Sequence, residues 1–218
     1  MRTALLIFLL ISTSAQAQVR AIYRDSKLPT QQMVEKQTIT NPAAAGTTQV
    51  LSANAGATSA AVATVTTFVA QPDVPRNLVI TPGGTTGDVE SCVIVVAGTS
   101  IKNRAISENF TFLADASTAQ TGSKAFKTIT SVTFPANCES GGFAATWSVG
   151  YGEKLGVKEC MGGAGHIFFS TLNGAKEATA PTMAVSASAV ESNTADFNGT
   201  MNGSNDFELF FIQNFGCL

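Results

Sequence analysis

Short runs of apolar and β-branched residues, separated by glycine, proline and asparagine, recur along the chain from residue 61 onward. The run ISENFTFL, from Ile106 to Leu113, alternates apolar and polar positions, and so presents one face to a core and the other to solvent. The run CVIVVA, from Cys92 to Ala97, is continuously apolar and predicts a strand buried on both faces. Runs of this length and composition favour strands over helices.

The other runs share this enrichment in β-branched or aromatic residues, with turn residues between them. The expected strands span Ala61 to Ala70, Asn77 to Thr81, Val89 to Ala97, Ile106 to Leu113, Ala125 to Phe134, Ala144 to Gly150, His166 to Leu172, Thr182 to Ala189, Thr194 to Phe197 and Phe207 to Ile212. Many short strands with little helix indicate an all-β fold. We expect an antiparallel β-sandwich, immunoglobulin-like or jelly-roll-like, with an extended N-terminal arm.

Three glycine-containing stretches are expected to form turns. PGG at residues 82–84 should close the strand before it, and NG at 202–203 should make a turn before the last strand. In GYGEKLG, at residues 150–156, the three glycines suit positive φ angles, so a turn or bulge between strands is expected there.

The chain divides into three regions, of which the first, residues 1–17, is a signal-peptide-like apolar segment. Arg2 precedes an apolar run from Ala4 to Ile11, and small residues end the segment. Cleavage is expected after Ala17, and the run is too short for a permanent membrane anchor. The alternative is a retained apolar arm that packs on a neighbouring subunit. Residues 18–60 are expected to form an extended arm or linker, and residues 61–218 the β-sandwich domain.

The arm is identified by its composition. Small residues dominate from Thr40 to Ala60, with too few large apolar groups to build a core. Ahead of them we expect at most a short helix, over residues 31–37. The arm should reach onto neighbouring subunits, so that deleting Val19 to Ala60 prevents assembly but leaves the β-domain folded.

The charge balance argues against one class of partner. The 218 residues have a formal net charge of -2 and a pI near 5.4, with only 13% charged residues. This composition provides no basic surface for a phosphate backbone, so nucleic acid is not an expected partner. The length suits one main domain.

The four cysteines, Cys92, Cys138, Cys160 and Cys217, suit disulfides in an exported chain. Three pairings are open to them, and buried free thiols are the alternative. No Cys-x-x-Cys pair occurs, and the only histidine, His166, has no partner at metal-site spacing. We therefore expect neither a metal nor a cofactor.

The sequence offers no persuasive catalytic constellation. A serine–histidine–acid site would need His166, which we interpret as a structural side chain at the start of a buried strand. A glycosidase would need two carboxylates across a cleft, and no pair stands out. The acids considered are Asp88, Glu90, Glu108, Asp115, Glu139, Glu153 and Glu159. We expect a protein without enzymatic activity and without catalytic residues.

Two kinds of binding site have candidate residues in the sequence, but simpler structural roles explain those residues better. Turn acids near residues 86–90 or 191–196 are the candidates for a calcium site, but neither stretch fits an EF-hand loop. A carbohydrate platform would need exposed aromatic side chains. Trp147 is instead expected to be half-buried, and four phenylalanines are expected in the core. They are Phe110, Phe112, Phe168 and Phe169.

Five motifs follow one another in a recognisable order. They are QPDVPRNLVIT from Gln71, AFKTI from Ala125, VGYGEKLG from Val149, LNGAKEATAPT from Leu172 and VESNT from Val190. In this order, ahead of a final apolar strand, the chain resembles β-domains of structural proteins of tailed bacteriophages and prophages. The resemblance spans residues 71–212.

The resemblance implies a non-enzymatic virion protein, with capsid decoration or cementing, or another head-associated role, expected ahead of a tail or fibre role. Its implied partners are the protein itself and other virion proteins, such as a major capsid or tail protein. The signal-like start and the cysteines depart from cytoplasmic assembly. They favour the alternative of a secreted bacterial surface adhesin or glycan-binding β-sandwich module.

Overall fold

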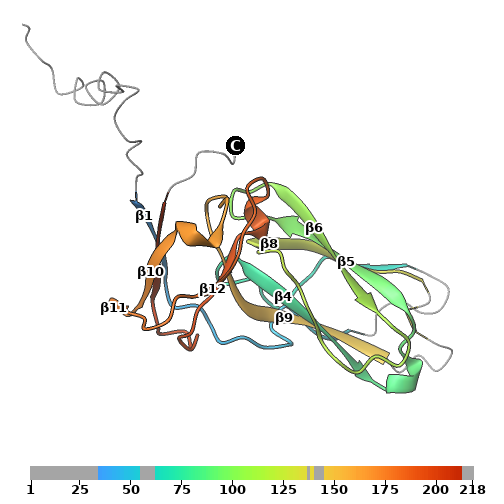
Figure 1. Ribbon diagram of the computed structural model, residues 1–218. Helices are drawn as coiled ribbons and strands as arrows, with labels where there is room; N and C mark the ends of the chain where they lie inside the picture. Colours follow the sequence, from blue (N-terminus) through green and yellow to red (C-terminus); the bar gives the residue numbers. More distant parts are fainter. Residues whose placement is uncertain (1–33, 55–61, 137, 140–144, 213–218) are drawn as a thin grey trace, which may run out of the picture. The chain divides into compact units, whose positions relative to one another are not determined.

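The computed structural model describes residues 34–54, 62–136, 138–139 and 145–212. Over these residues the chain forms three antiparallel sheets with three short 3-10 turns, and no α-helix (Figure 1). The expected antiparallel all-β class is therefore confirmed. The described residues all belong to one compact unit, which begins at Val34.

The first two sheets are each built around a long antiparallel pair. In the β4–β9 sheet, β4 (Arg76–Gly84) pairs with β9 (Ala145–Gly156), and the order is β12-β13-β9-β4-β7 with β2 also on β9. Its shorter strands are β2 (Leu51–Asn54), β7 (Gln120–Thr121), β12 (Thr182–Ala184) and β13 (Thr194–Asp196). The β5–β8 sheet has the order β3-β8-β5-β6, with β3 (Ala63–Val65), β5 (Cys92–Thr99), β6 (Ala105–Phe112) and β8 (Thr128–Phe134).

The third sheet joins the two ends of the described chain. This β10–β14 sheet has the order β1-β14-β10-β11. Its strands are β1 (Val34–Ile39), β10 (Ile167–Leu172), β11 (Ala175–Lys176) and β14 (Phe207–Ile212). Because Val34 pairs with Ile212, the first and last described residues lie side by side at one end of this sheet.

Two apolar cores hold the sheets together. The larger one is formed by inward residues of the β4–β9 and β5–β8 sheets, including Leu78, Ile94 and Trp147. Trp147 was expected to be half-buried but is fully buried, with its ring 4.9 Å from that of Phe112 in an edge contact. The smaller core packs the inner face of the β10–β14 sheet against the end of β9.

Two local expectations from sequence are wrong, and a third is confirmed in part. GYGEKLG is not a turn, because β9 continues through it to Gly156, but the expected bulge is present as a register shift between β4 and β9, opposite Arg76 and Leu78. PGG does not close the preceding strand but lies within the end of β4. The run CVIVVA is buried on only one face, since Val93 is 39% exposed. The turn at residues 202–203 is confirmed: Gly203 has a φ of 77°.

The glycines of GYGEKLG are needed for close approach rather than for positive φ. A Cβ at Gly152 would collide with the side-chain amide of Asn77, and one at Gly150 would collide with the carbonyl oxygen of Gly46. Asn77 uses the space to donate to the Gly122 carbonyl and to accept from the Lys154 backbone N–H, both at 2.9 Å. The glycines therefore let QPDVPRN pack directly onto β9.

A fully buried arginine, Arg76, organises this junction. Its Nε and Nη2 donate to the Gly152 carbonyl at 2.9 and 2.6 Å, and its Nη1 donates to the Ala43 carbonyl at 2.9 Å. Nη1 also pairs with Asp73 at 3.0 Å, and Asp73 accepts from the Ala43 N–H. One guanidinium thus ties β4 and β9 to the segment that follows β1.

Two further motifs, AFKTI and VESNT, meet at the same junction. Phe126 of AFKTI exchanges two backbone hydrogen bonds with Arg76, and Ala125 donates to the carbonyl of Glu191 in VESNT. The side-chain oxygen of buried Asn193, in VESNT, accepts from the backbone N–H groups of Met161 and Ser186. Its side-chain nitrogen donates to the Ser186 carbonyl. Residues of four of the five motifs, all except LNGAKEATAPT, therefore meet at one folded junction.

The expected arm differs from the structure over residues 34–54. A short helix was expected over residues 31–37, but the described part of that stretch belongs to strand β1. Strand β2, also within the expected arm, pairs with β9. Val50 and Leu51 are core residues. Removal of Val19 to Ala60 would take strands from two sheets, so the expectation that the domain folds without this segment is not supported.

We predict that Arg76→Met lowers the free energy of unfolding by roughly 3 kcal/mol, because it leaves buried carbonyls and Asp73 without their partner. The measurement is urea unfolding followed by tryptophan fluorescence. Lys102→Met, which breaks the exposed Lys102–Glu159 pair, is the control and should cost less than about 1 kcal/mol. Equal effects of the two substitutions would contradict the role given to Arg76.

Candidate functional site

The outer face of the β10–β14 sheet carries a cluster of apolar side chains that does not belong to either core. Along β14 the alternation buries Phe207, Leu209 and Phe211 and turns Phe210 and Ile212 to the opposite face. The pairing register of β14 with β1 and β10 places further apolar side chains of those two strands on the same face. We call the set Val34, Phe168, Phe169, Phe210 and Ile212 the aromatic face.

A β-bulge in β10 produces the most exposed ring. Ile167 pairs with Phe211, but Phe169 pairs with Phe210, so Phe168 is an extra residue in the ladder. Bulges re-aim side chains and are common near functional sites. Phe168 is 53% exposed and Val34 is 56% exposed. The expectation that Phe168 lies in the core is therefore wrong, and Phe169 is only half-buried.

The centre of the aromatic face is a stacked pair. The rings of Phe169 and Phe210 lie 4.3 Å apart with an interplanar angle of 21°. The ammonium group of Lys176, on β11, lies 5.7 Å from the Phe169 ring, in a cation–π contact. The pair is held in a fixed geometry on a sheet rather than on a loop.

A polar row borders the cluster on the same face. Glu208 on β14 pairs with Lys36 on β1 at 2.7 Å and accepts from the Thr171 hydroxyl at 2.9 Å. The hydrogen bond from Lys36, then that from Thr171, lowers the pKa of Glu208. The row keeps this carboxylate charged and fixed beside the phenylalanines.

The sequence-predicted catalytic candidates are dispersed. His166 ends a 3-10 turn just before β10, and its buried Nδ1 has no hydrogen-bond partner among the described residues. Glu108 accepts from the backbone of Ser123 and Lys124, and Glu159 pairs with Lys102. Glu153 is exposed on β9. These side chains do not converge on one site.

Asp88 and Glu139 are the two candidate acids that do interact. Val89 and Glu139 form an isolated antiparallel bridge, and the Glu139 side chain is buried with its Oε1 unbonded. Burial raises the pKa of Glu139, and the negative charge of Asp88 raises it further. Within the described residues, no group of three or more potential ligands that could hold a metal ion occurs.

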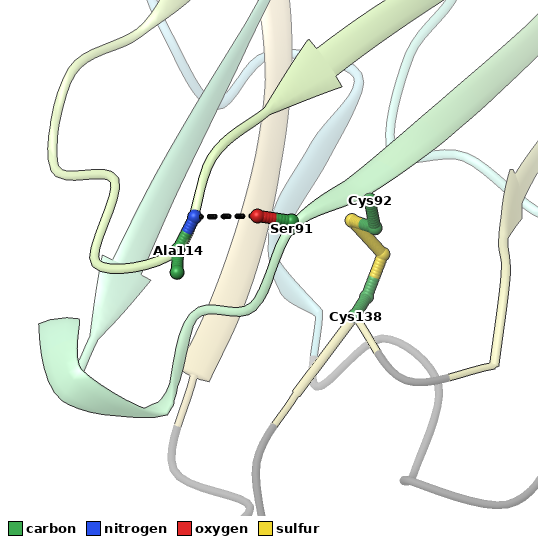
Figure 2. The surroundings of a disulfide bond; sticks show 4 residues. All are labelled: Ser91, Cys92, Ala114 and Cys138. Carbon is green, nitrogen blue, oxygen red and sulfur yellow. Dashed lines mark hydrogen bonds between the residues drawn. A yellow bond between two sulfur atoms is a disulfide. The ribbon is translucent and has the colours of Figure 1, made fainter.

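A disulfide joins Cys92, at the start of β5, to Cys138, one residue before Glu139 (Figure 2). Next to it, the Ser91 hydroxyl accepts from the Ala114 N–H at 2.9 Å. No described cysteine is a free thiol, Cys160 included. Cys217 lies outside the described residues. The Cys92–Cys138 pair is thereby assigned, which the even number of cysteines alone did not allow.

A shallow groove of about 400 Å³ lies over the close contact between QPDVPRN and β9. Its lining includes Asn77, Tyr151, Lys154 and Asp196. The Asn77 amide is fully used by backbone groups, and the Tyr151 hydroxyl donates to the Gln71 carbonyl at 2.6 Å. Burial, then the charge of Asp73, raises the pKa of Tyr151. These groups serve the fold, and we do not assign them a reaction.

Sequence reasoning missed the aromatic face because Phe168 and Phe169 both fall within an apparently apolar strand. The irregularity IFF in place of strict alternation is the signal of the bulge.

No helix among the described residues is long and apolar enough to cross a membrane. Comparisons with protein-family models, curated proteins and solved structures find no match to the chain.

We predict that Glu139 makes stability depend on pH. Its folded-state pKa lies above the unfolded value, so the folded state binds more protons, and the free energy of unfolding falls as pH rises through the folded-state pKa. Glu139→Gln should remove this slope in urea unfolding between pH 4 and 8, a range that begins near the ordinary Glu pKa of roughly 4.3 and extends above it. Glu153→Gln, at an exposed position, is the control and should retain it. An unchanged slope in Glu139→Gln would refute the assignment.

Proposed function

We propose that the chain is a non-enzymatic virion structural subunit, of the capsid-decoration or other head-associated kind, that makes assembly contacts through the aromatic face. The observation that carries the proposal is the exposed Phe168 beside the stacked Phe169–Phe210 pair. Clustered exposed apolar side chains mark interaction sites on soluble proteins.

The physical properties of the face suit a protein partner. Large aromatic side chains supply much of the binding energy of protein interfaces, and charged groups lie at their rims. Here Lys36, Lys176 and Glu208 border the rings. Because strands on both sides hold the rings, little conformational freedom remains to be lost on binding.

The resemblance of the five motifs to tailed-phage structural proteins supports the virion setting. The junction of Arg76, Asp73 and Asn193 supports the structural part of the proposal, because these three motif residues make their hydrogen bonds and their ion pair within the fold. The implied partners are further copies of the chain and other virion proteins.

The test is incorporation into particles. The double variant Phe168→Ser and Phe210→Ser should reduce the copies per purified particle at least about tenfold, the effect of losing one strong hot spot. The control, Val93→Ser and Leu113→Ser, removes exposed apolar groups elsewhere and should be incorporated normally. Normal incorporation of the aromatic-face variant, with both variants folded by circular dichroism, would refute the proposed role of the face.

The disulfide favours a second candidate, a secreted bacterial surface adhesin or glycan-binding module. Cys92–Cys138 suits an oxidising compartment, in which such proteins function. Intact mass and location separate the two functions. A mature chain beginning near Gln18, found in the medium and absent from particles, would replace the virion proposal with the surface-protein one.

A further inference from the structure

We infer that the aromatic face is the dimerisation surface of the chain, and that its occupant is the aromatic face of a second copy. This inference rests on the proposed function only in that both place a protein on this face. It chooses one of the implied partners, a second copy of the chain, and adds the symmetry of the contact.

The cross-strand register makes the centre of the face self-complementary. Antiparallel pairing sets Phe169 of β10 opposite Phe210 of β14, so chemically identical rings stand on the two central strands. A two-fold contact needs residue i of one copy to meet residue j of the other, and j to meet i. A contact of Phe169 with the second copy's Phe210, made twice, satisfies this requirement.

The charges of the face are compatible with this partner. Glu208 is already paired with Lys36 and hydrogen-bonded to Thr171, so a second copy meets a neutralised row. The Lys176 ammonium makes no ion pair among the described residues, and it lies over the Phe169 ring at the border with the short edge strand β11. From that border a flexible lysine head can stay in water while its stem covers apolar surface.

The size of the cluster sets the expected strength. Phe168 is 53% exposed, and Phe169 and Phe210 are less exposed, so the six rings, three from each copy, supply at most roughly 500 Å² of buried surface. Val34, Ile212 and the lysine stems must supply the rest of the roughly 1,200 Å² found in the smaller stable interfaces. A dimer of this size should dissociate on dilution.

Photocrosslinking identifies the occupant directly. The full chain, isolated from the native host or secreted with its disulfides intact, carries Phe168→p-benzoylphenylalanine and is irradiated at high concentration. We expect a covalent dimer whose linked peptide includes β10 or β14 of the second copy. A link to residues 1–33 or 213–218 of the same chain, a link to any other surface of a second copy, or no link would overturn the inference.

Sedimentation velocity over a wide concentration range provides an independent readout. The unsubstituted chain should shift from monomer to dimer, and Phe169→Ser with Phe210→Ser should raise the dimer dissociation constant at least about tenfold. Val93→Ser with Leu113→Ser is the matched control and should dimerise like the unsubstituted chain. Dimerisation that survives in the Phe169 and Phe210 variant, or a monomer at every concentration, contradicts the inference.

These two measurements can refute the dimer without refuting the proposed function, because neither measurement uses particles. A face-dependent dimer absent from virions would keep the inference and remove the virion role. A monomer whose incorporation still depends on Phe168 and Phe210 would keep the virion role and remove the dimer.

Discussion

The buried guanidinium of Arg76 is the constraint on which the rest of the fold depends. A charged group without solvent must have its donors satisfied, and here the partners are Asp73 and the carbonyls of Gly152 and Ala43. Those partners belong to different parts of the chain, so they must all be in place together. The segment after β1, the long strand β9 and the start of β4 therefore fold as one unit, and β1 is fixed where it completes the β10–β14 sheet.

That fixed sheet edge gives the aromatic face its shape. β1 pairs along its whole length with β14, and Gln37 bonds the Gly156 carbonyl and the Lys158 N–H, which anchors β1 to the end of β9. The inner face of β14 is sealed into a core, so the outer face holds Phe210 and Ile212 without freedom to turn inward. The bulge at Phe168 then adds an exposed ring to a rigid surface. The proposed assembly role needs a packed scaffold and a presented apolar surface, and different faces of the same strands would provide them.

Most of the strands could be predicted from sequence, because period-two alternation and turn residues report directly on sheet faces. β6, β10 and β14 lie within a residue or two of their expected positions. The errors have physical causes. Gly152 permits a tertiary contact with Asn77 that no local pattern encodes, and β1 draws its stability from β14, far away in the sequence. The aromatic face was missed for a related reason: a hydrophobic residue indicates burial only when the register is known, and a single bulge turned Phe168 outward. The disulfide partner of Cys92 likewise depends on tertiary proximity.

The most direct test of the central claim is to measure where the native chain resides and in what proportion. Gradient-purified particles would be washed at high salt and analysed by quantitative mass spectrometry against the major shell protein. A structural subunit predicts a fixed simple ratio of copies that survives the wash, because the contact is largely apolar and therefore weakly screened by salt. A chain that is absent from particles, or present in a ratio that falls with washing while it accumulates in the medium, would contradict the account.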